Sequence, residues 1–188
     1  MNEGGALDQT KLHKSNIIGE PDLIARGHSR WSMKLILITW IGTLGFDFLW
    51  HGGFLSEIYN LPNPALLDLE QAFARIPLGY GSLLIQVVLF YWLFLMIGVE
   101  EWQKGLRIGL MFGGLMGIAS ILGQYSILTL ELGILILWSM GQVFEFGAMG
   151  MILGAGISAT SLKSMAARIV ALVILAIVFG IILQSEIH

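Results

Sequence analysis

The sequence predicts an all-α, polytopic integral membrane protein with five transmembrane helices. Of its 188 residues, 56% are hydrophobic and only 12% are charged, whereas a soluble domain carries about 25% charged residues. The mean hydropathy is +0.79, and several apolar runs reach the ~20 residues needed to cross a hydrocarbon core. The chain has no cysteine, which excludes disulfides and thiolate metal sites.

Residues 1–32 are polar and of mixed charge, and we expect them to form a cytoplasmic N-terminal tail. A cleavable signal peptide is not expected, because this polar segment is long and the apolar run after it is long enough to span a membrane. The transmembrane domain is expected to occupy residues 33–184.

Five apolar segments make up that domain. The polar connection after the first contains Asn63 and Pro64, a favourable helix start, because Asn caps a helix and Pro needs no N–H in its first turn. Apolar residues then recur at helical spacing up to Pro77, so we expect an amphipathic surface helix at about 64–76. The predicted spans are about 33–55, 78–98, 106–128, 132–156 and 166–183.

The third predicted span carries four glycines at four-residue spacing, at 105, 109, 113 and 117. Residues at this spacing share one face of a helix, and small residues there let a second helix approach closely. We therefore expect a helix–helix contact on this face. A ligand-lined groove is the alternative that the pattern leaves open.

The distribution of Lys and Arg predicts the orientation of the chain. With the N-terminus in the cytoplasm, nine of the ten Lys and Arg residues are cytoplasmic and only Arg75 is external. Cytoplasmic loops are enriched in these residues, so the bias favours an odd number of spans. The N-terminus is therefore expected to be cytoplasmic and the C-terminus external, in a multi-pass protein of the inner membrane.

Polar residues form a stripe on four of the five spans. The stripes are Thr39, Thr43, Asp47 and His51; Ser82 and Gln86; Ser120 and Gln124; and Gln142 and Glu145. Such stripes are unfavourable against lipid, so we expect them to face one another. The fifth span has no such stripe, and we expect a four-helix bundle with a polar centre plus one peripheral helix.

The candidate site lies in this polar centre, towards the outer half of the bundle. Ionisable residues at membrane depth are costly and are therefore suspected of function. Asp47 and His51 are one helical turn apart, and Glu145 lies in a similar aromatic frame, because both acids are flanked by two phenylalanines. The predicted ligand-binding residues are Asp47, His51, Glu145, Gln142, Gln86, Gln124, Trp50 and Trp138.

Two segments, FDFLWHGGFLSEIY in the first span and WSMGQVFEFGAMG in the fourth, resemble parts of small, uncharacterised bacterial membrane proteins that are grouped as domains of unknown function. The resemblance covers roughly residues 35–156. It implies a bundle of about four helices with an acidic or aromatic-rich first helix, and it implies no activity. The fifth span and the long N-terminal segment depart from that pattern.

Three functions remain open at this stage, beside a purely structural role for the polar residues. Two carboxyl groups framed by aromatic rings suit the binding or transport of a small cationic or protonatable ligand. A small chain whose outer helix lacks polar residues also suits an accessory subunit of a respiratory or photosynthetic complex, in which His51 ligates a haem or pigment. Third, the same residues could act as acid and base on a lipid or isoprenoid.

No cofactor and no catalytic residue can be assigned from the sequence. Asp47, His51 and Glu145 could ligate a metal as carboxylates and imidazole, but their spacing matches no established metal-binding signature, and we assign no metal. The expected partners are membrane lipid and either further copies of the chain or subunits of a larger complex. Nucleic acid is not expected, because the basic residues are spread among several loops.

Overall fold

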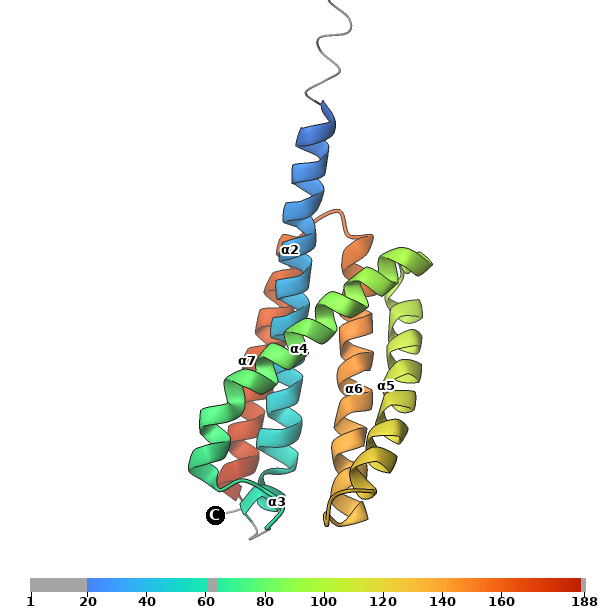
Figure 1. Cartoon of the computed structure of the whole chain (residues 1–188). Coiled ribbons are helices and arrows are strands. Elements are labelled where there is room, and N and C mark those ends of the chain that lie inside the picture. The colour runs from blue at the N-terminus through green and yellow to red at the C-terminus, as the bar shows by residue number, and fades with distance from the viewer. Residues whose placement is uncertain (1–19, 61–63, 187–188) are drawn as a thin grey trace, which may run out of the picture. The chain divides into compact units, whose positions relative to one another are not determined.

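A computed structural model describes residues 20–60 and 64–186, and every regular element in that part of the chain is a helix (Figure 1). The chain divides into two compact units, Met1–Lys34 and Leu35–His188. The described residues of the first unit belong to helix α2 (Glu20–Asp47). The predicted tail is therefore helical from Glu20 onwards, whereas residues 1–19 lie outside the described part.

Five helices are long and apolar enough to cross a membrane, as predicted. The candidate spans are Trp31–Phe54, Glu70–Ile97, Trp102–Tyr125, Leu132–Ile157 and Leu162–Ser185. They lie in α2 with the π-helix η1 (Phe48–Phe54), in α4 (Leu69–Ile97), α5 (Trp102–Tyr125), α6 (Leu132–Ile157) and α7 (Leu162–Glu186). A short helix, α3 (Ser56–Asn60), follows η1.

Within the second unit, α5 and α6 form one antiparallel pair, α7 lies along η1 and α2, and α4 crosses obliquely over both pairs (Figure 1). At one end of the crossing, the indole nitrogen of Trp40 donates a hydrogen bond to the carbonyl of Tyr80, at 2.9 Å. At the other end, Phe90 packs against Phe146 with ring centroids 5.0 Å apart. The helix α4 therefore ties the first span to α6.

The glycine ladder of α5 packs against α6, as predicted for a helix–helix contact. All four of its glycines are buried. A Cβ at Gly109 would overlap the carbonyl of Phe146, and a Cβ at Gly150 would overlap the carbonyl of Gly105. The two backbones are thus in direct contact, and neither helix can carry a side chain at these positions without moving apart.

The predicted surface helix at about 64–76 is corrected by the structure. Pro64 and Ala65 lie in a turn, Asn63 is outside the described residues, and the helix begins at Leu69, where the carboxylate of Asp68 accepts a hydrogen bond from the backbone N–H of Gln71 at 2.8 Å. No break follows at Pro77, which lies inside α4. Proline removes one backbone hydrogen bond, but a long apolar helix tolerates it.

A second departure from the sequence prediction is the π-helix at the end of the first span. The backbone N–H of Leu55 bonds to the carbonyl of Trp50, five residues earlier, at 2.9 Å. Here the chain packs against α7: a Cβ at Gly53 would lie 3.2 Å from the Cα of Gly180. Single-turn π segments often occur at functional sites.

Helix α7 covers the first span on one side and is otherwise exposed. Its Val173 packs against Gly45, and the amide of Gln184 donates a hydrogen bond to the carbonyl of Gly52. In the most apolar window of this helix only 6% of the residues are buried, against 39% for α6. Most of the surface of α7 therefore faces away from the rest of the chain.

Candidate functional site

Three ionisable side chains from two distant parts of the sequence meet inside the second unit. Asp47 ends α2, His51 lies in η1, and Glu145 lies in the middle of α6. One potential ligand atom from each residue can be chosen so that all three lie within 4.8 Å of one another. Glu145 is buried, with 7% of its surface exposed, whereas Asp47 and His51 are half-buried.

The imidazole of His51 lies between Glu145 and a tyrosine. Its Nδ1 atom is 2.7 Å from the hydroxyl oxygen of Tyr59, a hydrogen bond whose direction depends on the tautomer. Its Nε2 atom is 3.8 Å from Oε1 of Glu145, which is beyond hydrogen-bond length. One ring nitrogen is therefore fixed by Tyr59, and the other faces the carboxyl groups across a small gap.

Two phenylalanines orient Glu145 by packing in different directions. Phe144 lies against the first span, with its ring centroid 6.3 Å from that of Phe46 and 5.8 Å from that of Trp50. Phe146 packs into the apolar core against Phe90 and Phe112. Successive residues of a helix point about 100° apart, so these two contacts leave Glu145 directed at the cluster.

Trp50 lies at the contact between η1 and α6. Its indole nitrogen donates a hydrogen bond to the carbonyl of Leu137 at 3.1 Å. The ring fills the notch over Gly141, where a Cβ would lie 2.5 Å from Cδ1 of Trp50. This contact fixes the segment that carries His51 against the helix that carries Glu145.

Trp138 and Tyr59 form an aromatic wall beside the cluster. Their rings are stacked, with centroids 6.4 Å apart and an interplanar angle of 16°. Burial of the hydroxyl is the main cause that raises the pKa of Tyr59 to about 12; the indole N–H of Trp138 opposes the shift, and the charges of Asp47 and Glu145 add to it. The indole nitrogen of Trp138 is buried on the side of its ring next to Tyr59.

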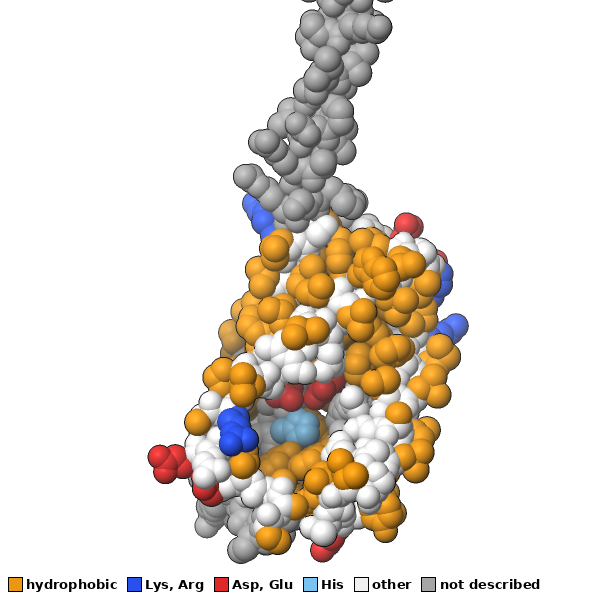
Figure 2. Space-filling view, viewed as in Figure 1, with side chains coloured by type: hydrophobic (Ala, Val, Ile, Leu, Met, Phe, Trp, Pro, Cys, Tyr) orange, Lys and Arg blue, Asp and Glu red, His pale blue; other side chains and the backbone are white. Residues whose placement is uncertain are grey.

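The cluster can be reached from the surface. Figure 2 shows a histidine at the bottom of an opening, with acidic side chains directly above it and hydrophobic side chains around it. His51 is the one histidine whose side chain the structure describes. A small solute could therefore reach the imidazole and the carboxyl groups without a rearrangement of the helices.

Of the three glutamines predicted to bind the ligand, one lies beside the cluster and two have their hydrogen-bond partners elsewhere. Gln142 is half-buried and lies on α6 between Trp138 and Glu145, on the face that meets Tyr59 and His51. The amides of Gln86 and Gln124 each donate a hydrogen bond to a serine one turn earlier in their own helix, Ser82 and Ser120 respectively. The observed partners of these two glutamines therefore lie outside the cluster.

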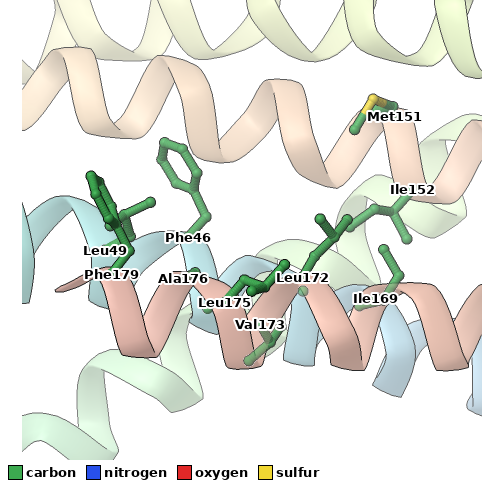
Figure 3. Close-up of a pocket in the computed structure, with 12 residues that line it drawn as sticks. Phe46, Leu49, Met151, Ile152, Ile169, Leu172, Val173, Leu175, Ala176 and Phe179 are labelled. Atoms are coloured by element: carbon green, nitrogen blue, oxygen red, sulfur yellow. The ribbon is translucent and has the colours of Figure 1, made fainter. Parts of the chain in front are cut away.

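A separate hollow of about 390 Å³ lies between the first span, α6 and α7 (Figure 3). Its walls are formed only by apolar side chains and glycines, among them Phe46, Met151 and Leu172. The hollow offers no polar group to orient a ligand, so it is not a candidate for ionic binding or for acid–base chemistry.

Tyr59 was not assigned to the site from the sequence. A signal for it exists, because Tyr59 continues the four-residue spacing of Asp47 and His51 after one apolar position, Leu55. The two turns between His51 and Tyr59 are not continuous α-helix, however, and periodicity alone does not predict that they meet.

Comparisons with known protein families, with curated proteins and with solved structures gave no match. The resemblance to small bacterial membrane proteins of unknown function therefore stays an expectation.

Proposed function

We propose that the protein is a multi-pass protein of the inner membrane that binds or transports a small cationic or protonatable ligand at Asp47, His51 and Glu145. The convergence of these three side chains carries the proposal, because their ligand atoms lie within 4.8 Å of one another. Two carboxyl groups and one imidazole together favour a positively charged occupant, since unpaired anionic groups at membrane depth are unfavourable.

The proposed orientation has the N-terminus in the cytoplasm and the C-terminus outside, with four polar spans around the cluster and a peripheral fifth. His51 is three residues from the end of its candidate span, so the cluster lies in the outer half of the bundle. The exposed surface of α7 supports its peripheral place. Membrane lipid, a second copy of the chain or a partner subunit is the proposed neighbour of that surface.

The aromatic wall supports an occupant that carries positive charge. Rings of Tyr and Trp attract cations that lie over their faces within about 6 Å. The ring of Tyr59 lies 6.1 Å from that of His51, and the ring of Trp138 stacks on the ring of Tyr59. A haem-ligating subunit is less well supported, because Nδ1 of His51 is held by Tyr59 and Nε2 faces Glu145.

Titration calorimetry on the purified chain in lipid nanodiscs tests the proposal. The probes are Na⁺, K⁺, Mg²⁺, Mn²⁺, Zn²⁺ and tetramethylammonium. We expect at least one of them to bind with one site per chain, and Asp47→Asn and Glu145→Gln each to weaken binding at least tenfold, which is about 1.4 kcal/mol.

Glu131→Gln is the matched control for Glu145→Gln. Glu131 precedes the first residue of the same helix, is exposed, and its side chain makes no capping hydrogen bond. This variant should bind like the unaltered chain. Failure of every probe to bind, or an equal effect of the two glutamate variants, would contradict the proposed function.

A further inference from the structure

We propose that the cluster is a binding site for a divalent transition-metal ion, with Asp47, His51 and Glu145 as ligands and Tyr59 as the residue that positions His51. This inference rests on the proposed function, because it names the class of cation that the same site takes.

The donor atoms favour this class of ion. Imidazole suits Zn²⁺, Fe²⁺, Co²⁺ and similar ions, whereas Mg²⁺, Ca²⁺ and the alkali ions prefer oxygen donors alone. Two carboxylates and one divalent cation also sum to zero charge. A neutral assembly is the least unfavourable occupant of a site at membrane depth, since a monovalent ion would leave one negative charge uncompensated.

The distances are close to those of a coordinated ion. In a four-coordinate site with bonds of about 2.1 Å, neighbouring ligand atoms lie about 3.4 Å apart. Nε2 of His51 and Oε1 of Glu145 are 3.8 Å apart, and all three ligand atoms fall within 4.8 Å. Rotation of the side chains through less than about 1.5 Å would bring them to bonding separations, without movement of the helices.

Tyr59 supplies the outer contact that metal-bound histidines usually have. Such a histidine donates the N–H of its second nitrogen to a fixed acceptor, which sets the tautomer and orients the ring. The hydroxyl of Tyr59 lies 2.7 Å from Nδ1. With the proton on Nδ1, Nε2 carries the lone pair, and it is Nε2 that faces Glu145.

The cluster leaves room for a ligand that the protein does not supply. An ion held by three protein ligands keeps an open fourth position, which water usually fills. The opening in Figure 2 gives such a water a route of entry to the cluster.

Cobalt binding to the full-length chain, purified through a tag without histidine, tests this inference. We expect Co²⁺ to give a visible absorption spectrum that saturates at one ion per chain and is displaced by Zn²⁺. Tyr59→Phe should weaken Co²⁺ affinity by about 10- to 100-fold, the usual effect of losing an outer contact of a metal-bound histidine, and should change the spectrum of the bound ion.

Two controls separate this outcome from non-specific effects. Tyr125→Phe removes an exposed hydroxyl at the end of α5 and should leave affinity and spectrum unchanged. Replacing His13, His28 and His188 together by Gln removes the other imidazoles of the chain and should also change nothing, whereas His51→Gln should abolish the spectrum.

The inference would be overturned if Co²⁺, Mn²⁺ and Zn²⁺ all failed to bind, or if they bound equally well to Glu145→Gln. Binding of tetramethylammonium without any of these metals would overturn the metal site and leave the proposed function standing. If no cation of either kind binds, both fail.

Discussion

Replacing Gly141 by Ala should loosen the contact that fixes η1 against α6. A Cβ at Gly141 would lie 2.5 Å from Cδ1 and 2.6 Å from Nε1 of Trp50. Ordinary contact begins at 3.4 Å, so the ring must withdraw by about 0.9 Å. Its hydrogen bond to Leu137, now 3.1 Å, would then exceed 3.5 Å and be lost.

The expected change in the free energy of unfolding follows from two opposing effects. Leaving the partly buried indole N–H of Trp50 unpaired costs about 1–3 kcal/mol. Alanine inside a helix gains about 0.5–1 kcal/mol over glycine. Gly114, inside α5, is the matched control, because a Cβ there would meet nothing within 4 Å. Both variants share the helix-propensity gain, so their difference isolates the lost contact, and Gly141→Ala should be less stable than Gly114→Ala by about 1–3 kcal/mol.

The assay is reversible unfolding in mixed detergent micelles with increasing SDS, followed by far-ultraviolet circular dichroism. Surface substitutions usually change the free energy of unfolding by less than about 0.5 kcal/mol. If the free energies of unfolding of Gly141→Ala and Gly114→Ala differ by no more than this, the packing of Trp50 over Gly141 is not what holds η1 to α6. Cation binding measured on the same two variants in their folded state should be weaker for Gly141→Ala only, because His51 lies in the displaced segment.

Three further outcomes are expected. Gly109→Ala, whose Cβ would overlap the backbone of α6, should destabilise the chain by about 1–3 kcal/mol or more in the same SDS titration, again with Gly114→Ala as reference. Asp68→Ala should cost about 1 kcal/mol, because the N-cap of α4 is lost, whereas Asp68→Asn should restore most of it. The absorbance difference at 295 nm between the unaltered chain and Tyr59→Phe should titrate with a midpoint near pH 12. The folded pKa of Tyr59 is raised from 10 to about 12, so the unfolded chain loses this proton first. The contribution of the protonated hydroxyl to folding stability should therefore fall as the pH rises from 10 through 12. A midpoint near 10 would contradict the desolvation of the Tyr59 hydroxyl that raises its pKa.

Features that depend on local periodicity could be predicted from the sequence. The five apolar segments have the length and hydropathy of spans, and each appears as a helix. Only the start of the second differs clearly from its expected bounds, because α4 begins at Leu69 and not near residue 78. The glycine ladder from Gly105 to Gly117 predicts close helix packing, because four-residue spacing places small residues on one face whatever the partner helix is.

Features that depend on tertiary contacts could not be predicted. Pro77 predicts a helix end when the sequence is taken alone, yet α4 continues through it. The π-helix around His51 occurs where Gly53 meets Gly180, a contact between segments more than 120 positions apart in the chain. The meeting of Asp47 with Glu145 was suggested by their shared aromatic frame, but only the packing of η1 on α6 shows that they are neighbours.

A double-mutant cycle on cation affinity tests most directly whether Asp47 and Glu145 act as one site. Affinity for the tightest-binding cation of the calorimetric series would be measured for the unaltered chain, for Asp47→Asn, for Glu145→Gln and for the double variant. If one ion touches both carboxyl groups, the double variant should lose at least about 1 kcal/mol less than the sum of the single losses. Strictly additive losses, or no loss in either single variant, would show that the two acids do not share a ligand.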